Sequence, residues 1–434
     1  MPIAEKRSVF PVSVEELFDW HARPGALQRL TPPWEDVKVL ASTGGIQVGA
    51  QIDLAMRIGP LPVRWRAFHD GYEEDRWFRD IQVRGPFACW VHDHRFEAVP
   101  EGAALTDHVE YELPLAPLGT WFGGRIARTT LERTFRYRHA LLRLDLLRHS
   151  QFRSKGSRRF VVSEPAGEIG AALCAFLGTG GHTVERISND LRSAGNPEAF
   201  TLAALEGADV VIHLSSSNSE AEVEYMRTLS TTLSRMGRKP EALIVVGDAS
   251  VYGDRGDEVL DEASAPGSGR VAGLAVAREA ATAPAVAAGI RTVLLRTGAV
   301  LTPAGGILRR LLPWFRAGLG FRLGGGGRQM SSVSLEDLLG VIQFSAFTGT
   351  LSGPVNVATP EWVSNREFAA TLGRVLSRPS AVPLPCWKAP LVLGTRNAEL
   401  LMSSRAVVPQ ALQKAGFRFQ LPALEEALRF ELGC

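Results

Sequence analysis

The feature that most constrains the fold of this chain is the alternation of short apolar segments with helical segments from residue 159 onward. The apolar segments read "RFVVSE", "DVVIHLS", "EALIVVGD" and "IRTVLLRTG". Helices are expected at 169–177, near 198–206, at 220–236 and near 271–288. Strands that are apolar on both faces belong to parallel sheets covered by helices on both sides. The sequence therefore predicts a doubly wound α/β (Rossmann) domain.

The first third of the chain has a different, α+β pattern. A helical segment, "SVEELFDWHARPGALQRL", is interrupted at Pro24-Gly25. Strand-like runs such as "VRWRAFHDGY" and "CWVHDHRFEAV" follow, separated by turns rich in Gly, Pro and Asp. A long helix is expected over 131–149. A curved antiparallel sheet can grip such a helix and leave an apolar pocket between them. Trp65, Phe87, Trp90 and Tyr111 either line that pocket or belong to the core.

The two patterns meet at a polar, basic segment, "LLRHSQFRSKGSRR". We expect a ligand-binding domain at 1–147, a linker at 148–158 and a Rossmann domain at 159–434. The mixed, mostly helical part at the end of the chain is expected to form a lobe over the substrate, with a separate C-terminal module at 383–434.

Charge and cysteine content exclude several classes of protein. The chain carries 48 basic and 46 acidic residues, a balance that gives no basis for binding nucleic acid or membrane surfaces. Its 4 cysteines form no C-x-x-C pair, which argues against a disulfide scaffold or a structural zinc site. The sequence shows neither a signal peptide nor an apolar run long enough to span a membrane. We expect a cytoplasmic protein; its oligomeric state is not indicated.

Two family resemblances sharpen these expectations. "HARPGALQRLTPPWEDVKV" and "LTDHVEYELPL" resemble the START/polyketide-cyclase-like (SRPBCC) domains, which implies a helix-grip fold and a small lipophilic or aromatic ligand. "SVYGDRGDEVLDEASAPG" and "SGPVNVATPEWVSNREFAATLGRVLSRP" resemble atypical extended short-chain dehydrogenase/reductases, an epimerase-like family with its own C-terminal helical module. This second resemblance implies NAD or NADP as cofactor. Fusion of the two domains is an arrangement known in that family.

The first turn of the Rossmann domain, "VVSEPAGEIG", departs from the family's G-x-x-G-x-x-G pattern. Gly167 and Gly170 are present, but Glu164 stands where the first glycine is expected. A carboxylate 4 Å from a phosphate costs about 4 kcal/mol at an effective dielectric of ~20, unless it points into solvent. Pro165 also removes a backbone N–H. We predict a weakened cofactor site. Its residues in this turn are Glu164, Gly167, Glu168, Ile169 and Gly170.

Further cofactor contacts are expected at the ends of later strands. Asn189 or Asp190 follows the second strand, where the residue that binds the ribose hydroxyl is usually found. The alternative is that these residues only stabilise a turn. Ser215 and Ser216 either hydrogen-bond a phosphate or cap the next helix. Arg296 either reaches a phosphate or is structural.

The Ser-Tyr-Lys triad of extended short-chain dehydrogenases is absent. Asp248 occupies the serine position four residues before Tyr252, and "GRVAGLAVAREAATAP" contains neither Tyr nor Lys. Asp248 and Tyr252 are the remaining catalytic candidates at the carboxyl end of a central strand. The alternative for Asp248 is that it caps the following turn.

No metal site is predicted. His92 and His94 alternate along one strand and share a face. Asp107 or Glu110 on a neighbouring strand would have to supply further ligands, so polar pocket or surface histidines are the favoured interpretation.

Two functional hypotheses follow. In the first, the protein is an oxidoreductase or epimerase that acts on a small lipophilic substrate with degenerate catalytic residues. In the second, it is a non-catalytic pseudoenzyme that serves as a ligand-binding scaffold or sensor.

Overall fold

The computed structural model describes residues 1–59, 61–114, 118–163, 167–187, 202–215, 217–380, 382–394, 398 and 401–434. The chain forms two compact units, the first mainly Met1–Arg153 and the second mainly Ser154–Leu432. None of the helices in these described ranges has the length and apolar character needed to cross a membrane.

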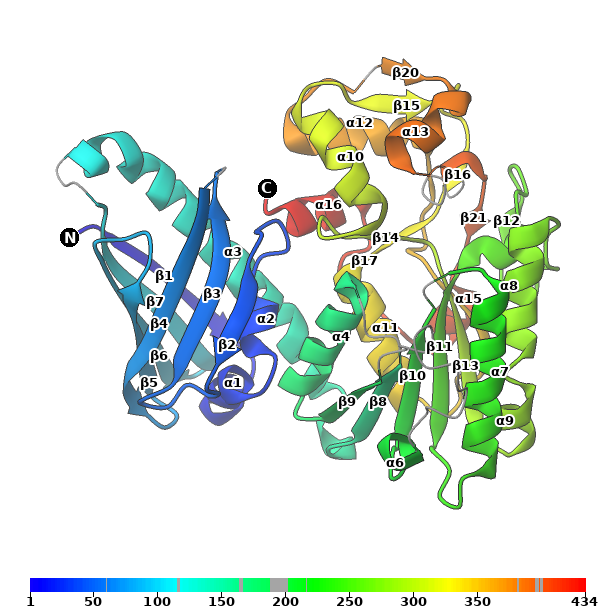
Figure 1. Ribbon diagram of the computed structural model, residues 1–434, viewed down its shortest axis with the longest axis horizontal. Coiled ribbons are helices and arrows are strands. Elements are labelled where there is room, and N and C mark those ends of the chain that lie inside the picture. Colours follow the sequence, from blue (N-terminus) through cyan, green and yellow to red (C-terminus); the bar gives the residue numbers. More distant parts are fainter. Residues whose placement is uncertain are drawn as a thin grey trace. The chain divides into compact units, whose positions relative to one another are not determined.

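The first unit is built on a seven-stranded antiparallel sheet in the order β1-β7-β6-β5-β4-β3-β2 (Figure 1). Its strands are β1 (Ile3–Phe10), β2 (Lys38–Ser42), β3 (Gln51–Ile58), β4 (Leu61–Glu73), β5 (Trp77–Arg84), β6 (Cys89–Val99) and β7 (Gly102–Glu112). Its helices are α1 (Val14–Ala22), α2 (Ala26–Leu30) and α3 (Leu118–Ser150).

Alternation along the strands decides which face is buried. On β6, Trp90, His92, His94 and Phe96 are buried, whereas Arg95 between them is exposed. The buried face packs against α1 and α3 through a shared apolar cluster that includes Phe18 of α1 and Leu142 of α3. The sheet and α3 therefore enclose the core of this unit.

The helical interruption predicted at Pro24-Gly25 is confirmed: α1 ends at Ala22, and Gly25 adopts a φ of 99° before α2 begins. Two features differ from the expectation. The sequence pattern did not reveal β1, because the charged run Glu5-Lys6-Arg7 masks its apolar face. Helix α3 begins at Leu118 rather than near 131.

The second unit contains a six-stranded parallel sheet in the order β18-β13-β11-β10-β8-β9 (Figure 1). Its strands are β8 (Arg159–Ser163), β9 (Thr183–Ile187), β10 (Val210–Leu214), β11 (Ala242–Asp248), β13 (Arg291–Thr297) and β18 (Gly353–Val357). The helices beside them are α4 (Glu168–Thr179), α6 (Leu202–Leu205), α7 (Glu220–Arg235), α8 (Arg270–Ala280), α9 (Ala283–Ala287), α11 (Leu335–Phe347) and α15 (Gln410–Lys414).

Both faces of this sheet are buried, as its apolar strands predict. One face packs against α4, α11 and α15, and the other against α6, α7 and α9. The predicted doubly wound α/β fold is confirmed. The single helix expected near 271–288 is two helices, because Pro284, which has no N–H to donate, lies in the first turn of α9.

The remaining part of the chain forms short strands and helices beyond the sheet. The helical elements are η1 (Arg153–Lys155), η3 (Ala249–Tyr252), α10 (Gly306–Arg316), α12 (Asn365–Leu376), η4 (Cys386–Lys388), α13 (Ala389–Leu393) and α16 (Leu424–Leu432). The short strands are β12 (Val259–Leu260), β14 (Ala299–Leu301), β15 (Phe321–Leu323), β16 (Gln329–Met330), β17 (Ser332–Ser334), β19 (Val363–Ser364), β20 (Val382–Leu384) and β21 (Ala406–Val407).

Candidate functional site

The strand order of the parallel sheet reverses between β8 and β10. From β8 the chain proceeds to β9 on one side and to β10 on the other, so the direction of winding reverses at this point. In open α/β sheets, ligands bind outside the carboxyl ends of the strands at such a reversal. Here β8 ends at Ser163, β10 ends at Leu214, and α4 begins at Glu168. The first turn of an α-helix leaves backbone N–H groups without intrahelical partners, which favours an anion at the N-terminus of α4.

Gly167, the described residue just before α4, has a backbone conformation that glycine-rich phosphate-binding turns use. Gly167 has a φ of +89°, a conformation that side-chain-bearing residues rarely adopt. Gly170 is buried in the first turn of α4, and Glu168 and Ile169 are half-buried. The Glu168 carboxylate lies against Gly305, so that a side chain at Gly305 would overlap it. Glu164 lies outside the described residues, so Glu168 is the described carboxylate of this turn.

A buried arginine approaches the end of β10. The Arg278 guanidinium, on α8, donates hydrogen bonds to Ser215 Oγ at 2.9 Å and to Asn218 Oδ1 at 2.7 Å. Arg278 is 3% exposed. The structure thus brings the predicted Ser215 to a cation that the sequence analysis did not place in the site. The signal was present, because Arg278 and Glu279 are the ionisable residues in an apolar stretch of this helix. Asn189 and Ser216 lie outside the described residues.

The catalytic candidate Asp248 ends β11 and caps the following turn. Its Oδ1 accepts a hydrogen bond from the Ser250 backbone N–H at 3.0 Å, and its Oδ2 accepts one from Asn218 Nδ2 at 3.2 Å. The geometry matches the capping alternative. A catalytic role for Asp248 stays a prediction.

The second catalytic candidate, Tyr252, is fully buried. Arg296 donates to its hydroxyl at 2.9 Å, and that hydroxyl lies 2.7 Å from Asn356 Oδ1. Arg296 also donates two hydrogen bonds to Glu279, at 2.8 and 2.7 Å. Burial raises the pKa of Tyr252 above its ordinary value. Both Tyr252 and Arg296 are therefore committed to an internal network, which fits a structural role for each.

We expect Tyr252→Phe to lower the free energy of unfolding by about 1–3 kcal/mol, because it removes a buried hydroxyl that contacts Arg296 and Asn356. Affinity for any bound dinucleotide should not change. Chemical denaturation and calorimetry of the full chain measure the two quantities. An unchanged stability together with a weakened affinity would contradict the structural role.

A small hollow lies beside the carboxyl ends of β11 and β13. Its lining includes Ala249, Thr297, Met330, Ser331 and Arg405. This lining combines apolar surface with a hydroxyl and a cation.

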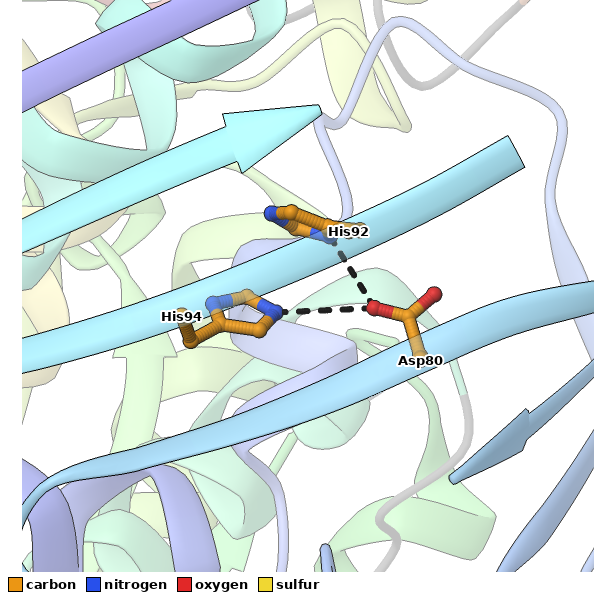
Figure 2. A group of neighbouring side chains, drawn as sticks. All are labelled: Asp80, His92 and His94. Carbon is orange, nitrogen blue, oxygen red and sulfur yellow. Dashed lines mark ion pairs between the residues drawn. The ribbon is translucent and has the colours of Figure 1, made fainter. Parts of the chain in front are cut away.

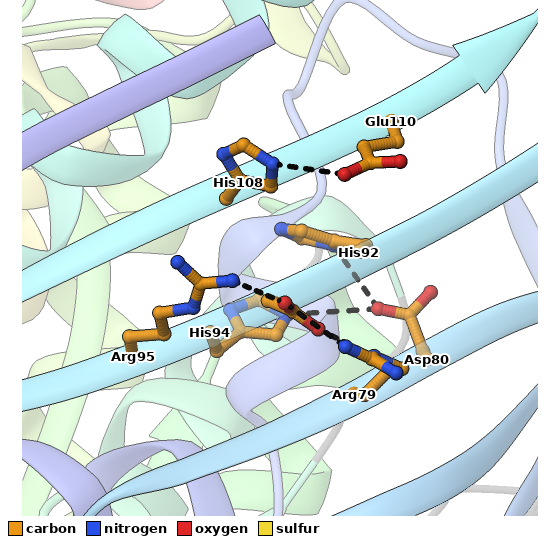
Figure 3. Close-up of polar contacts among 8 residues, drawn as sticks. Arg79, Asp80, His92, His94, Arg95, His108 and Glu110 are labelled. Atoms are coloured by element: carbon orange, nitrogen blue, oxygen red, sulfur yellow. Dashed lines mark hydrogen bonds and ion pairs between the residues drawn. The ribbon is translucent and has the colours of Figure 1, made fainter. Parts of the chain in front are cut away.

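The first unit contains a buried cluster of histidines and carboxylates (Figure 2). Asp80 Oδ2 lies 3.0 Å from His92 Nδ1 and 3.6 Å from His94 Nε2. Asp107 lies on the same face, with its Oδ1 2.6 Å from His94 Nδ1. Glu110 instead pairs with His108 at 3.4 Å on the other face of the sheet (Figure 3).

The sequence pattern indicated Asp107 or Glu110 as partners of these histidines, but not Asp80. Period-two alternation from the buried Phe78 places Asp80 on the inner face, and that signal was available. Burial alone would lower the pKa of His92, but Asp80 and Asp107 outweigh it and raise that pKa to about 9. The cluster thus consists of buried histidine–aspartate ion pairs inside an otherwise apolar core.

Comparisons with known proteins agree with this two-unit organisation. The family model described as "Polyketide cyclase / dehydrase and lipid transport" matches residues 10–135, and a domain of unknown function, DUF1731, matches 384–431. An epimerase family protein of Mycobacterium tuberculosis is 37% identical over 290 residues, which cover 62% of this chain and 96% of the relative. The epimerase family protein SDR39U1 of Homo sapiens is 27% identical, with 62% and 98% covered.

Solved structures are similar as well. The nucleoside-diphosphate sugar epimerase from Corynebacterium glutamicum superposes with a TM-score of 0.80 at 27% identity, covering 99% of this chain and 90% of that one. The human SDR39U1 structure, solved with NADPH, has a TM-score of 0.54 at 25% identity, covering 62% and 98%. The identity to the mycobacterial relative over nearly its whole length shows that the chain belongs to this epimerase family.

Proposed function

We propose that this chain binds a nicotinamide dinucleotide, NAD or NADP, at the carboxyl edge of its parallel sheet. The observation that carries the proposal is the reversal of winding between β8 and β10, with Gly167 and the N-terminus of α4 beside it. The pyrophosphate would take the free N–H groups of α4, and Ser215 with Arg278 would contact the part of the dinucleotide near β10. The human relative solved with NADPH supports the same assignment.

We propose further that the first unit is a helix-grip domain that holds a lipophilic or aromatic ligand. Its sheet and α3 have the required layout, and the matching family model includes lipid transport in its description. Trp65 and Trp90 stack edge to face at 4.9 Å. Their indole N–H groups are buried without hydrogen-bond partners among the described residues. A ligand with an acceptor atom would satisfy them. Mass spectrometry of molecules extracted from native protein tests this, and a consistently ligand-free protein would contradict it.

We also propose the following domain limits. They are 1–147 for the ligand-binding domain and 159–434 for the Rossmann domain, with 148–158 as linker and 383–434 as the C-terminal module.

The chemistry of the second unit has two candidate forms. When bound, a nicotinamide ring supplies hydride transfer, which suits an oxidoreductase or epimerase step on a substrate in the hollow beside Thr297. The capping role of Asp248 and the burial of Tyr252 favour the alternative, a non-catalytic scaffold or sensor that retains the dinucleotide. Absorbance at the nicotinamide band reports a net oxidoreductase step, and NMR analysis of the substrate's stereochemistry reports an epimerase step, which regenerates its cofactor. A scaffold produces neither change.

Calorimetric titration of the full chain with NAD, NADH, NADP and NADPH tests the proposed binding directly. We expect one site for at least one of these dinucleotides. The absence of heat with all four at millimolar concentration would contradict the proposal.

We expect Glu168→Gln to tighten dinucleotide binding about tenfold. The substitution removes a negative charge from the first turn of the helix that would hold the pyrophosphate, and a tenfold change in affinity corresponds to about 1.4 kcal/mol. The matched control is Glu426→Gln, which removes an exposed carboxylate from the first turn of α16 and should leave affinity unchanged. Equal effects of the two substitutions would show that net charge, rather than this turn, controls binding. Glu164→Gly in the same assay tests the first-glycine position.

A further inference from the structure

The buried face of the N-terminal sheet carries a donor set that dinucleotide binding does not use. We propose that Asp80, His92 and His94 form a binding site for a divalent transition-metal ion (Figure 2). The proposal concerns the first unit alone, and its test does not depend on whether the second unit binds a dinucleotide.

The three donor atoms are spaced for a common ion. Each residue offers one ligand atom, and these atoms all lie within 4.8 Å of one another. Asp80 Oδ2 is 3.0 Å from His92 Nδ1 and 3.6 Å from His94 Nε2. Two ligands bound at about 2.0–2.2 Å from one ion are separated by roughly 3.0–3.6 Å at ordinary coordination angles. An ion can therefore be accommodated with only small side-chain movements.

A second carboxylate lies behind both imidazoles. The nitrogen of each ring that faces away from Asp80 approaches Asp107 Oδ1, at 2.6 Å for His94 Nδ1 and 3.5 Å for His92 Nε2. The other oxygen of Asp107 is 2.9 Å from His139 Nε2 on α3. Carboxylates in this position fix the tautomer and orientation of metal-binding histidines and raise their basicity. Asp107 is thus a positioning residue for the proposed site.

The donors sit on rigid elements. Asp80 on β5 is directly opposite His92 on β6, and His94 is two residues further along the same strand. The side chains of His92 and His94 are 4% and 10% exposed, whereas that of Asp80 is 16% exposed. The three donors therefore belong to the sheet itself, and Asp80 has the most exposed side chain of the three.

The donor chemistry selects the class of ion. Imidazole nitrogens suit Zn²⁺, Fe²⁺, Co²⁺ and Ni²⁺, whereas Ca²⁺ and Mg²⁺ prefer all-oxygen sites. Two histidines and one carboxylate leave at least one position open for water or a ligand group.

The test uses the full chain after removal of metal with a chelator. Titration with CoCl₂ should give one equivalent of bound Co²⁺ and visible absorption bands of a low-coordinate complex, and Zn²⁺ should displace it. Asp80→Asn should weaken Co²⁺ binding at least ~100-fold, and Asp107→Asn about 10–100-fold. The matched control is His108→Gln, on the outer face of β7. His108 also lies between two carboxylates, Glu5 at 2.8 Å and Glu110 at 3.4 Å, and its loss should not change binding.

Two results would overturn the proposal. One is a wild-type protein that binds none of Co²⁺, Zn²⁺, Fe²⁺ or Ni²⁺ at millimolar concentration. The other is binding that His108→Gln and Asp80→Asn affect equally. If Asp80→Asn fails to fold, X-ray absorption of the wild-type Co²⁺ complex decides the question: two imidazole ligands support the site, and their absence overturns it.

Discussion

Replacing Asp145 with Asn should destabilise the N-terminal unit by about 3–5 kcal/mol, because it takes the carboxylate away from a buried arginine. Arg29 Nε donates to Asp145 Oδ2 at 2.9 Å, and Arg29 Nη2 donates to Oδ1 at 2.6 Å. The two side chains are only 4% and 1% exposed. The pair joins α2 to α3, so its loss affects the packing of the long helix on the sheet.

The chain supplies a matched control for this prediction. Arg66 and Asp53 form the same two-hydrogen-bond geometry, at 2.6 and 2.8 Å, but their side chains are 50% and 31% exposed. Asp53→Asn should therefore cost much less stability than Asp145→Asn. Urea denaturation followed by tryptophan fluorescence measures both variants, with a separate transition allowed for each unit. Similar losses for the buried and the exposed pair would contradict the reasoning.

Replacing Glu279 with Gln should destabilise the second unit by about 3 kcal/mol, because Arg296 would be left in the core without a counter-charge. The side chain of Arg296 is 8% exposed, and its two bonds to Glu279 accompany its bond to Tyr252. Hydrogen exchange of β13, measured by mass spectrometry, should accelerate together with the loss of stability.

The control here is Glu258→Gln. Glu258 accepts two hydrogen bonds from Arg255, at 2.8 and 2.6 Å, and its side chain is 48% exposed. Its substitution should cost less than about 1 kcal/mol. A stable Glu279→Gln protein with altered dinucleotide affinity would instead indicate that Arg296 belongs to the cofactor site.

Local patterns in the sequence predicted most of the fold. The apolar strands "DVVIHL" and "EALIVVG" and the helices between them specify a parallel sheet, because nothing else buries both faces of such segments. Strand β1 was missed because its pairing with β7 joins residues about a hundred positions apart, and its charged side chains mask the alternation.

The candidate sites were harder to predict, because they depend on contacts between distant segments. The sequence "EPAGEIG" predicted a glycine with a positive φ angle. This prediction is confirmed, because Gly167 has a φ of +89°. The burial of Tyr252 depends on Arg296 and Asn356, which are 44 and 104 positions away in the chain. Asp80 joins His92 only through the register of β5 and β6. No spacing rule within one segment reveals such partners.

The central claim is that the reversal between β8 and β10 holds a dinucleotide. Its most direct test is a crystal structure of the protein grown with NADPH. We predict electron density for the pyrophosphate at the N-terminus of α4 beside Gly167, with Ser215 and Arg278 in contact with the dinucleotide. A structure at saturating NADPH with no dinucleotide at this reversal, or with one bound elsewhere, would contradict the claim.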